Sequence, residues 1–379
     1  MAQRFILNGT SYHGAGAIQE IATEAKAHGF QKAFVCSDPD LIKFGVTKKV
    51  TDVLDKNGLV YEIYSDIKPN PTIQNVQHGV QAFKDSGADY LIAIGGGSSM
   101  DTSKAIGIII ANPEFEDVRS LEGVAPTKKP CVPIIAVPTT AGTAAEVTIN
   151  YVITDVEKKR KFVCVDPHDM PIIAIVDPEM MSSMPKGLTA STGMDALTHA
   201  IEAFLNLFAS RSVQNASIEA VCENFHALPE AWRDGSRLAA RQEMLHASYL
   251  AGFAFTNNFV GYVHAIAHAV GALYHIPHGR ANAVLLPAVL REYGSCIAPK
   301  LAVLADALSL GGDTVSEKAE RMIAAIEAMR DSFDIPSTLP HLPPNDYAEI
   351  ARRALKEANP TYPVPQIWDS EKIFSVLRR

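Results

Sequence analysis

The chain has 379 residues, 47% of them hydrophobic, which is enough for roughly two to three domains with sizeable cores. Its net charge of −8 and pI near 5.8 argue against a nucleic-acid partner, because phosphate binding needs a concentrated basic face. There is no apolar run long enough to predict a membrane span, and the start has no signal-peptide pattern. Five scattered cysteines are typical of free thiols, so we expect a cytoplasmic protein.

The first half alternates short apolar runs with amphipathic helical stretches. Most of these runs are continuously apolar, as in strands that are covered on both faces. We predict strands at residues 32–36, 59–64, 89–94, 132–137 and 172–176. Helices are expected at residues 18–28 and 46–57, each followed by a glycine that can end it. This alternation predicts an α/β domain with a parallel sheet.

After Pro185 the pattern becomes helical. Long apolar-periodic stretches dominate, at residues 192–207, 213–228, 238–255, 264–273 and 315–333. Such periodicity is typical of amphipathic helices. We therefore predict two domains, an α/β domain over residues 1–185 and an all-α domain over residues 186–379.

Gly95, Gly96, Gly97 and Ser98 directly follow one of the predicted strands, and a helix is expected to begin near Met100. Glycines let the backbone approach an anion, and a helix N-terminus supplies N–H donors to it. The string differs from the dinucleotide fingerprint G-x-G-x-x-G because position 100 is methionine. We predict a phosphate-binding loop in a variant Rossmann-like sheet; the alternative is a tight turn without a ligand.

Two further features follow predicted strands. Asp38 could accept a hydrogen bond from a ribose 2′-hydroxyl and repel a 2′-phosphate, which would favour NAD over NADP; alternatively it starts a turn or caps a helix. The loop at 138–143 places the hydroxyls of Thr139 and Thr140 after another strand. Those hydroxyls suit contacts to a cofactor, although a turn rich in threonine explains them as well.

A cluster of metal-ligand residue types lies in the helical half. Asp195 and His199 are spaced i, i+4, which puts them on one helix face. His264 and His268 repeat this spacing, and His278 follows. Imidazoles with one carboxylate suit zinc, iron or another first-row divalent ion. Asp195, His199, His264 and His278 make a plausible four-ligand site. His268 is then either a competing ligand or a proton relay. Taken singly, each histidine is more typical of a hydrogen-bonded core or surface position than of a ligand, but taken together, in apolar helical surroundings, they favour a metal site.

An ion at such a site could lower the pKa of an alcohol or polarise a carbonyl. With a nicotinamide as hydride donor or acceptor nearby, these features indicate a dehydrogenase.

Four stretches also resemble the iron-dependent (group III) alcohol dehydrogenases, and the resemblance runs from end to end. They are 174–202 (AIVDPEMMSSMPKGLTASTGMDALTHAIE), 264–279 (HAIAHAVGALYHIPHG), GGGSSMDTSKA and PTTAGTAAEVT. The resemblance implies an N-terminal NAD-binding α/β domain and a C-terminal helical metal-binding domain. It also implies hydride transfer between NAD(H) and a small primary alcohol or aldehyde, and a homodimer.

The resemblance assigns residues to each part of the site. It places Fe²⁺, with Zn²⁺ as the alternative in purified protein, on Asp195, His199, His264 and His278. It places His268 near the nicotinamide as a catalytic residue. It places NAD along Asp38, Asn70, Gly96, Gly97, Ser98, Asp101, Thr139, Thr140 and Lys161, and the substrate near Asn150, Val152 and Phe255.

The substrate is less closely defined than the chemistry. The first half resembles family members that act on lactaldehyde and 1,2-propanediol, whereas segments after about Glu202 resemble members with broader substrates. We expect lactaldehyde, 1,2-propanediol or a similar short-chain alcohol, with ethanol or butanol as the alternative. The change in likeness also raises the hypothesis that the chain joins two parental sequences.

Other functions remain as alternatives. Glycerol dehydrogenases and dehydroquinate synthases share NAD, a divalent ion and this two-domain plan. A synthase would need a basic cluster for its substrate's phosphate, but residues 264–278 are mainly apolar. A non-catalytic metal or nucleotide sensor is a different class, and the complete set of ligands argues against it.

Overall fold

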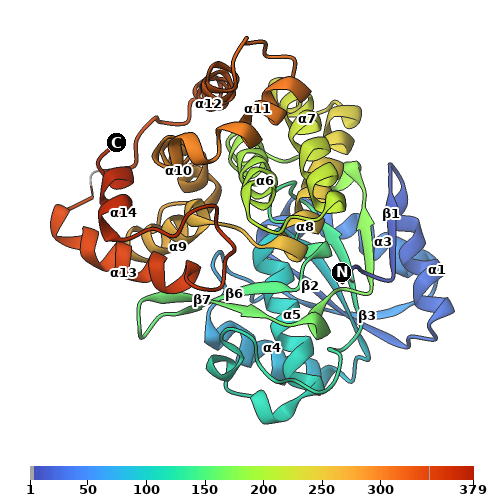
Figure 1. Ribbon diagram of the computed structural model, residues 1–379. Coiled ribbons are helices and arrows are strands. Elements are labelled where there is room, and N and C mark those ends of the chain that lie inside the picture. The colour runs from blue at the N-terminus through green and yellow to red at the C-terminus, as the bar shows by residue number, and fades with distance from the viewer. Residues whose placement is uncertain (1–3, 341) are drawn as a thin grey trace. The chain divides into compact units, whose positions relative to one another are not determined.

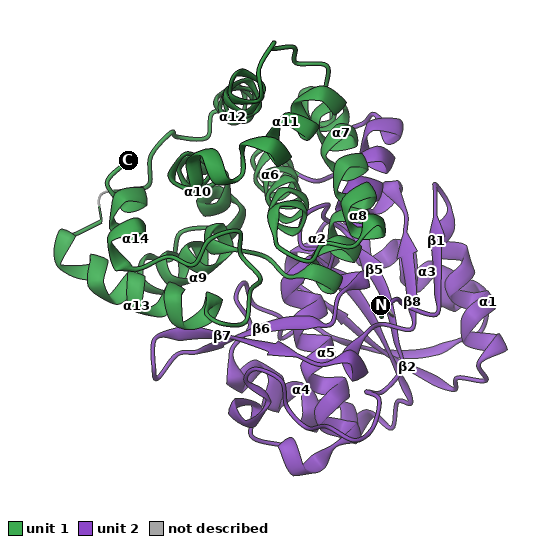
Figure 2. Ribbon diagram, in the orientation of Figure 1, with its two compact units in different colours: residues 1–5, 185–235, 250–379 green, residues 6–184, 236–249 purple. Residues whose placement is uncertain are grey.

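The computed structural model describes residues 4–340 and 342–379, which form two compact units (Figure 2). Unit 2 contains Ile6–Met184 and Ser236–Tyr249. Unit 1 contains the described parts of Met1–Phe5, Pro185–Gly235 and Leu250–Arg379. Residues 236–249, which the sequence places in the helical half, therefore group with unit 2.

A six-stranded sheet forms the centre of unit 2, in the order β1-β8-β5-β4-β2-β3 (Figure 1). All of its pairings are parallel, so the predicted parallel α/β fold is confirmed. Its strands are β1 Thr10–His13, β2 Lys32–Ser37, β3 Val60–Tyr64, β4 Tyr90–Gly95, β5 Ile134–Pro138 and β8 Ile173–Val176. An antiparallel hairpin of β6 Asn150–Asp155 and β7 Arg160–Val165 completes the strands.

Helices cover both faces of this sheet, which explains its continuously apolar strands. On β2, Phe34 belongs to a core shared with α4 and α5, whereas the next residue, Val35, belongs to a core shared with α1 and α3. Neighbouring side chains of a strand point to opposite faces, so α4 and α5 lie on one face and α1 and α3 on the other. The helices are α1 Glu20–Ala27, α2 Pro39–Lys43, α3 Val46–Lys56, α4 Ile73–Ser86 and α5 Gly97–Ala111.

The strand order reverses between β2 and β4. From β2 the chain continues outward to β3, whereas from β4 it continues in the other direction to β5 and β8. Ligands of open parallel sheets bind beyond the carboxyl ends of the strands at such a reversal. The loops after β2, β4 and β5 therefore form the part of unit 2 best placed to bind a nucleotide.

The described part of unit 1 is helical, as predicted. Within it α6 packs against α7 and α10, and α9 packs against α10 and α13. Helix α8 begins in unit 2 and ends in unit 1. The helices are α6 Lys186–Leu205, α7 Arg211–Arg233, α8 Leu238–Asn258, α9 Tyr262–Tyr274, α10 His278–Tyr293, α11 Ala298–Ala307, α12 Val315–Ser332, α13 Tyr347–Ala358 and α14 Ser370–Leu377.

Short 3₁₀ turns connect these elements. They span Ala17–Gln19, Pro113–Phe115, Val118–Leu121, Ala145–Val147, Pro167–Asp169, Pro178–Met181, Gly294–Cys296 and Pro344–Asp346.

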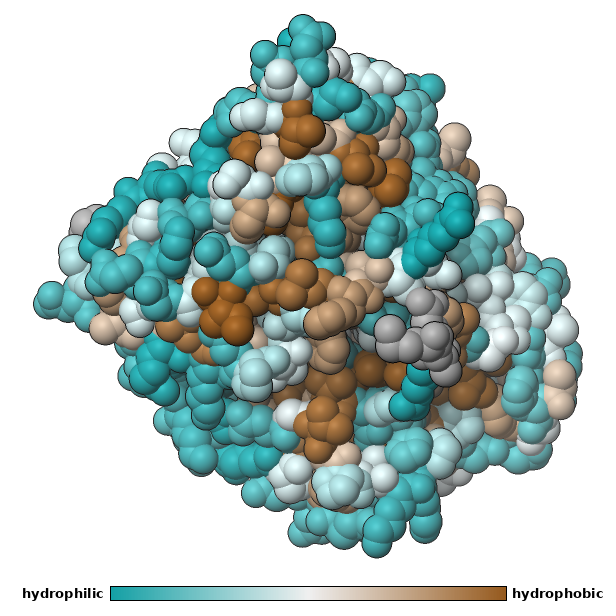
Figure 3. All heavy atoms as spheres, viewed as in Figure 1, coloured by the Kyte–Doolittle hydropathy of each residue, from teal (hydrophilic) through white to brown (hydrophobic). Residues whose placement is uncertain are grey.

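The surface carries apolar residues in small groups among hydrophilic ones, as the face in Figure 3 shows. Among the described residues, the most exposed large hydrophobic side chains are Phe208, Val124 and Ile367, at 89%, 78% and 75%. Within the described residues no helix is both long and apolar enough to cross a membrane.

The cysteines are free thiols, as predicted, and Cys36, Cys131 and Cys164 are buried.

Candidate functional site

The loop after β4 depends on glycine for its close packing. Gly95 has a φ of 150°, and a Cβ there would lie 2.3 Å from Ser99 Oγ. A Cβ on Gly96 would lie 3.0 Å from Thr140 Oγ1, so the glycines bring this loop against the loop that follows β5. Thr139 N also donates to the Gly95 carbonyl at 3.0 Å.

Helix α5 begins at Gly97, three residues earlier than the predicted start near Met100. The reason is that Gly96, in an extended conformation, already serves as its N-cap. The first N–H groups of a helix have no partner within the helix. The first turn of α5, with Ser98, is therefore suited to hold a phosphate at the carboxyl end of β4.

Asp38 directly follows β2, the strand beside β4. Its Oδ1 accepts hydrogen bonds from the backbone N–H groups of Asp40 and Leu41, at 2.9 and 3.0 Å, so it caps the short helix α2. Asp38 therefore does cap a helix, as the alternative interpretation predicted. The two hydrogen bonds fix its carboxylate at the reversal of strand order. A cap and a ribose contact are compatible, because a carboxylate has several acceptor positions.

Three other predicted cofactor residues lie around the β6–β7 hairpin. The carboxylate of Asp101, on α5, accepts a hydrogen bond from Val152 N at 3.2 Å. Lys161 Nζ donates to Asn70 Oδ1 at 2.6 Å. Desolvation raises the pKa of Asp101 to about 7, although Lys104, Val152 and Lys161 work against this rise. Desolvation also lowers the pKa of Lys161.

Three helices of unit 1 bring the predicted metal ligands together. Asp195 and His199 come from α6, His264 from α9, and His278 is the first residue of α10. Asp195 Oδ1 lies 3.6 Å from His264 Nε2 and 3.4 Å from His278 Nε2. Ligand atoms of Asp195, His199 and His264 all lie within 4.8 Å of one another.

The carboxylate of this cluster is held in its charged form by the imidazoles around it. Asp195, His199 and His264 are buried, and His278 is partly exposed. Burial acts to raise the pKa of Asp195, but His278, His199 and His264 hold it well below its usual range. One carboxylate and three imidazoles, all but His278 buried, converge to form a donor set that could hold a first-row divalent ion.

Gly279 permits the close approach of α10 to α6. A Cβ on this residue would lie 2.2 Å from the Ser191 carbonyl oxygen and 3.4 Å from Asp195 Cβ. Contacts as short as the first do not occur, so a side chain at 279 would force the two helices apart. The glycine thereby lets His278 reach Asp195.

His268 lies beside the cluster rather than within the group of closest ligand atoms. Its ring stacks on that of His278, with centroids 5.1 Å apart and planes at 14°. Its Nδ1 lies 2.8 Å from Glu357 Oε1. This arrangement fits the relay interpretation of His268 better than the ligand interpretation.

The predicted substrate residues are divided between the units. Phe255, in unit 1, is buried and stacks on His199 with centroids 4.3 Å apart. Asn150 and Val152 belong to unit 2 and are partly exposed on β6.

Comparison with known proteins places this chain in a family. Residues 8–178 match the family described as iron-containing alcohol dehydrogenase. Residues 189–379 match the C-terminal domain of the Fe-containing alcohol dehydrogenase family. The chain belongs to the iron-containing alcohol dehydrogenases. The predicted family and oxidoreductase class are thus confirmed.

Individual members of this family are similar over nearly the whole chain. Lactaldehyde reductase of Escherichia coli K12 is 48% identical over 347 residues, which cover 90% of this chain and 89% of that protein. A crystal structure of 1,3-propanediol oxidoreductase is 36% identical with a TM-score of 0.95, and covers 100% of this chain and 99% of that one. Sulfoacetaldehyde reductase from Bifidobacterium kashiwanohense, in complex with NAD⁺, is 27% identical with a TM-score of 0.89, covering 100% and 98%.

The similarity to lactaldehyde reductase is not confined to the first half, because an alignment of 347 residues must extend far beyond Glu202. The hypothesis of two parental sequences and the homodimer both stay predictions.

Sequence reasoning missed four polar residues around the cluster. Glu202 contacts His264, and Asn282 contacts Asp195. Spacing could have placed both residues on the helix faces that carry the ligands, since Glu202 is seven residues after Asp195 and Asn282 four after His278, but it could not have shown their partners on other helices. Glu357 contacts His268 from 89 residues away in the sequence, and Tyr362 donates to the same oxygen of Glu357; at such a separation spacing carries no signal.

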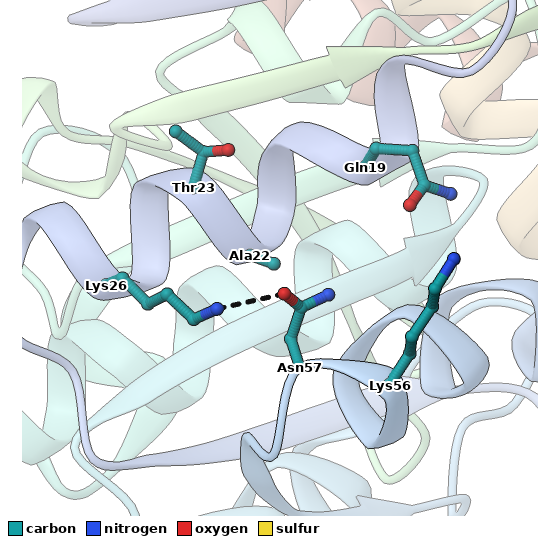
Figure 4. Close-up of a pocket in the computed structure, with 6 residues that line it drawn as sticks. All are labelled: Gln19, Ala22, Thr23, Lys26, Lys56 and Asn57. Atoms are coloured by element: carbon teal, nitrogen blue, oxygen red, sulfur yellow. Dashed lines mark hydrogen bonds between the residues drawn. The ribbon is translucent and has the colours of Figure 1, made fainter.

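A surface hollow lies between α1 and the end of α3 (Figure 4). Lys26 Nζ donates to Asn57 Oδ1 across it at 2.9 Å. The hollow is lined by none of the predicted site residues, and we assign it no part in the reaction.

Proposed function

We propose that this alcohol dehydrogenase transfers hydride between NAD(H) and a small primary alcohol or aldehyde at a site with one divalent ion, Fe²⁺ or, in purified protein, Zn²⁺. The observation that carries the proposal is the convergence of Asp195, His264 and His278. Asp195 Oδ1 lies 3.4–3.6 Å from Nε2 of the two histidines, and Asp195 and His264 are buried. Buried charged and imidazole groups are otherwise costly to bring together, and a divalent ion accounts for all of them.

The proposed NAD site lies at the carboxyl ends of β2, β4 and β5. Gly96, Gly97 and Ser98 would hold the pyrophosphate, and Asp38 would accept from the ribose 2′-hydroxyl. A carboxylate there disfavours a 2′-phosphate, which supports NAD rather than NADP. The complex of sulfoacetaldehyde reductase with NAD⁺, a protein of the same fold, also supports this choice.

In this proposal the remaining cofactor residues orient the dinucleotide. Asn70, Asp101 and Lys161 would do so beside the β6–β7 hairpin, and the hydroxyls of Thr139 and Thr140 would donate to it from the loop after β5.

The ion would supply a Lewis acid that makes the alcohol more acidic and the carbonyl more electrophilic, and the nicotinamide would exchange the hydride. The residues of this chain do the remaining work. Asp195, His199, His264 and His278 hold the ion. His268 moves the proton of the alcohol, and Glu357, 2.8 Å from its Nδ1, orients the imidazole for this role.

For the substrate we propose lactaldehyde, 1,2-propanediol or a similar short-chain compound. The 48% identity to lactaldehyde reductase supports this choice. Phe255 would provide an apolar wall in unit 1, and Asn150 and Val152 would contribute from β6. The similarity to 1,3-propanediol oxidoreductase favours a broader range of short alcohols as the second candidate.

A substrate screen with metal analysis of the same sample tests the proposal. We expect NADH oxidation with short aldehydes, fastest with lactaldehyde, and about one divalent ion per chain.

His278→Ala should lose the ion and lower turnover by roughly a thousandfold or more, because Lewis-acid catalysis contributes several kcal/mol. A metal-free His278→Ala variant with full activity would refute the metal role, and an inactive but metal-loaded wild type would support a sensor.

A further inference from the structure

Each of two helices that carry predicted ligands also carries a second buried polar residue, one turn further on. On α6, Glu202 follows His199 by three residues; on α10, Asn282 follows His278 by four. These spacings place each residue on the same helix face as the ligand before it. Glu202 is 4% exposed and Asn282 is fully buried.

Glu202 uses both carboxylate oxygens. Oε2 lies 2.6 Å from His264 Nδ1, and Oε1 accepts the backbone N–H of Val263 at 2.7 Å. A carboxylate oxygen can only accept, so the contact with Oε2 makes Nδ1 the nitrogen of His264 that carries hydrogen. The other nitrogen, Nε2, then carries the lone pair and faces Asp195 at 3.6 Å. The chain also makes room for this carboxylate, since a Cβ on Gly261 would lie 2.7 Å from Oε1.

Asn282 orients the carboxylate of Asp195, as Glu202 orients the imidazole of His264. Its Nδ2 donates to Asp195 Oδ1 at 2.6 Å, and lies 3.1 and 3.2 Å from Nε2 of His264 and His278. The amide nitrogen is therefore near three of the four predicted ligand atoms. Its Oδ1 is buried and has no hydrogen-bond partner among the described residues, so the hydrogen bonds that orient this amide are those that its Nδ2 makes to the ligands.

We infer that Glu202 and Asn282 are positioning residues of the metal centre. Glu202 selects the form of His264 that can bind an ion through Nε2, and Asn282 holds the carboxylate of Asp195 in its orientation. The inference rests on the proposed function, because it assumes that an ion binds at these ligands. Partners of this kind commonly contribute ten- to a hundredfold to metal affinity.

Glu202→Gln gives the sharpest test. If the amide oxygen accepts from Val263 N–H, the amide NH₂ faces His264 Nδ1. This contact favours the tautomer with hydrogen on Nε2, and that nitrogen then has no lone pair with which to bind a metal. The reverse orientation sets two N–H groups against each other. We therefore expect the affinity for Zn²⁺, measured by competition with a chromophoric chelator, to fall by about ten- to a hundredfold. The absorption bands of the Co²⁺-loaded chain should shift as well.

Asn282→Ala is the second variant, and it should also weaken Zn²⁺ binding. Asn258→Ala is the matched control, because Asn258 is a buried amide of the same unit that donates to the Ala203 carbonyl at 2.9 Å. We expect this control to lower thermal stability while leaving metal affinity unchanged, which separates a positioning role from a purely structural one. Circular dichroism of each metal-free variant verifies folding.

The outcomes separate the two proposals. Wild-type affinity in folded Glu202→Gln and Asn282→Ala would overturn the inference and leave the proposed function intact. A folded wild type that binds no divalent ion would overturn the proposed function itself. If Glu202→Gln does not fold, Glu202→Asp, which retains a carboxylate, decides for this position: it should bind Zn²⁺ more weakly than wild type, and wild-type affinity would count against the inference.

Discussion

Asp38 shows how one side chain can have a local and a functional reason for its position. Its Oδ1 caps α2 through two backbone N–H groups, and its place after β2 puts it at the reversal of strand order. The cap explains why the carboxylate is held in one orientation. The proposed ribose contact uses that orientation, so removing the side chain affects both.

Asp38→Gly should raise the use of NADP relative to NAD by about tenfold, because a charge that repels the 2′-phosphate costs on the order of a kcal/mol or more. Glycine also caps helices, so the loss of stability should be only a few tenths of a kcal/mol. The ratio of kcat/KM for the two cofactors is the measurement. Asp40→Gly, an exposed change in the same helix, is the control. An identical cofactor ratio in both variants would rule out the ribose role of Asp38.

At the scale of elements, α6 is the helix on which the metal centre depends. It carries Asp195 and His199 on the face that α10 approaches, and Gly279 sets how close that approach is. The C-terminal end of α6 is also secured, since Lys300 Nζ donates to the carbonyls of its last turn, at 2.8 Å from Phe204 O and 2.9 Å from Leu205 O. A cation is favourable at this end of a helix.

Gly279→Ala should separate α10 from α6, because the new Cβ would meet the Ser191 carbonyl. We expect a loss of stability of about 1–3 kcal/mol together with weaker metal binding, measured by chemical denaturation and by chelator competition. Gly187→Ala is the control: it lies on α6 with nothing within 4 Å of its Cβ, and should be neutral or stabilising. Equal metal affinity in both variants would show that the approach of the helices does not set the ligand geometry.

At the scale of the molecule, each proposed ligand belongs to one unit. The four metal ligands all lie in unit 1, and the predicted NAD residues all lie in unit 2. A ligand stabilises the part of a protein that binds it, by about 2.7 kcal/mol at a concentration a hundred times its Kd. The two ligands should therefore protect different sets of backbone amides.

Hydrogen exchange followed by mass spectrometry measures this difference. Zn²⁺ alone should slow exchange in α6, α9 and α10, whereas NAD⁺ alone should slow it in the loops after β2, β4 and β5. His278→Ala should lose the response to Zn²⁺ and keep the response to NAD⁺. Protection of the unit 2 loops by Zn²⁺ with no change in α6, α9 and α10 would contradict the assignment of the metal ligands.

The sequence by itself determined the parallel sheet, the helical unit and the ligand candidates. The strands of the sheet interior are continuously apolar because both faces are covered, so runs such as residues 89–94 are visible without a structure. Strand β1 was missed because it is short, polar and at the edge. The β6–β7 hairpin was missed because its burial alternates and its apolar signal is weaker.

Within the site, local spacing was enough for pairs on one helix and insufficient for partners on different helices. The i, i+4 pair of Asp195 and His199 follows from helix geometry alone. Only the tertiary structure decided that Asn282 reaches Asp195 and that Glu357 reaches His268, because these contacts depend on how α10 and α13 pack. The physical reason is that helical periodicity specifies a face, whereas the neighbour of that face is set by packing.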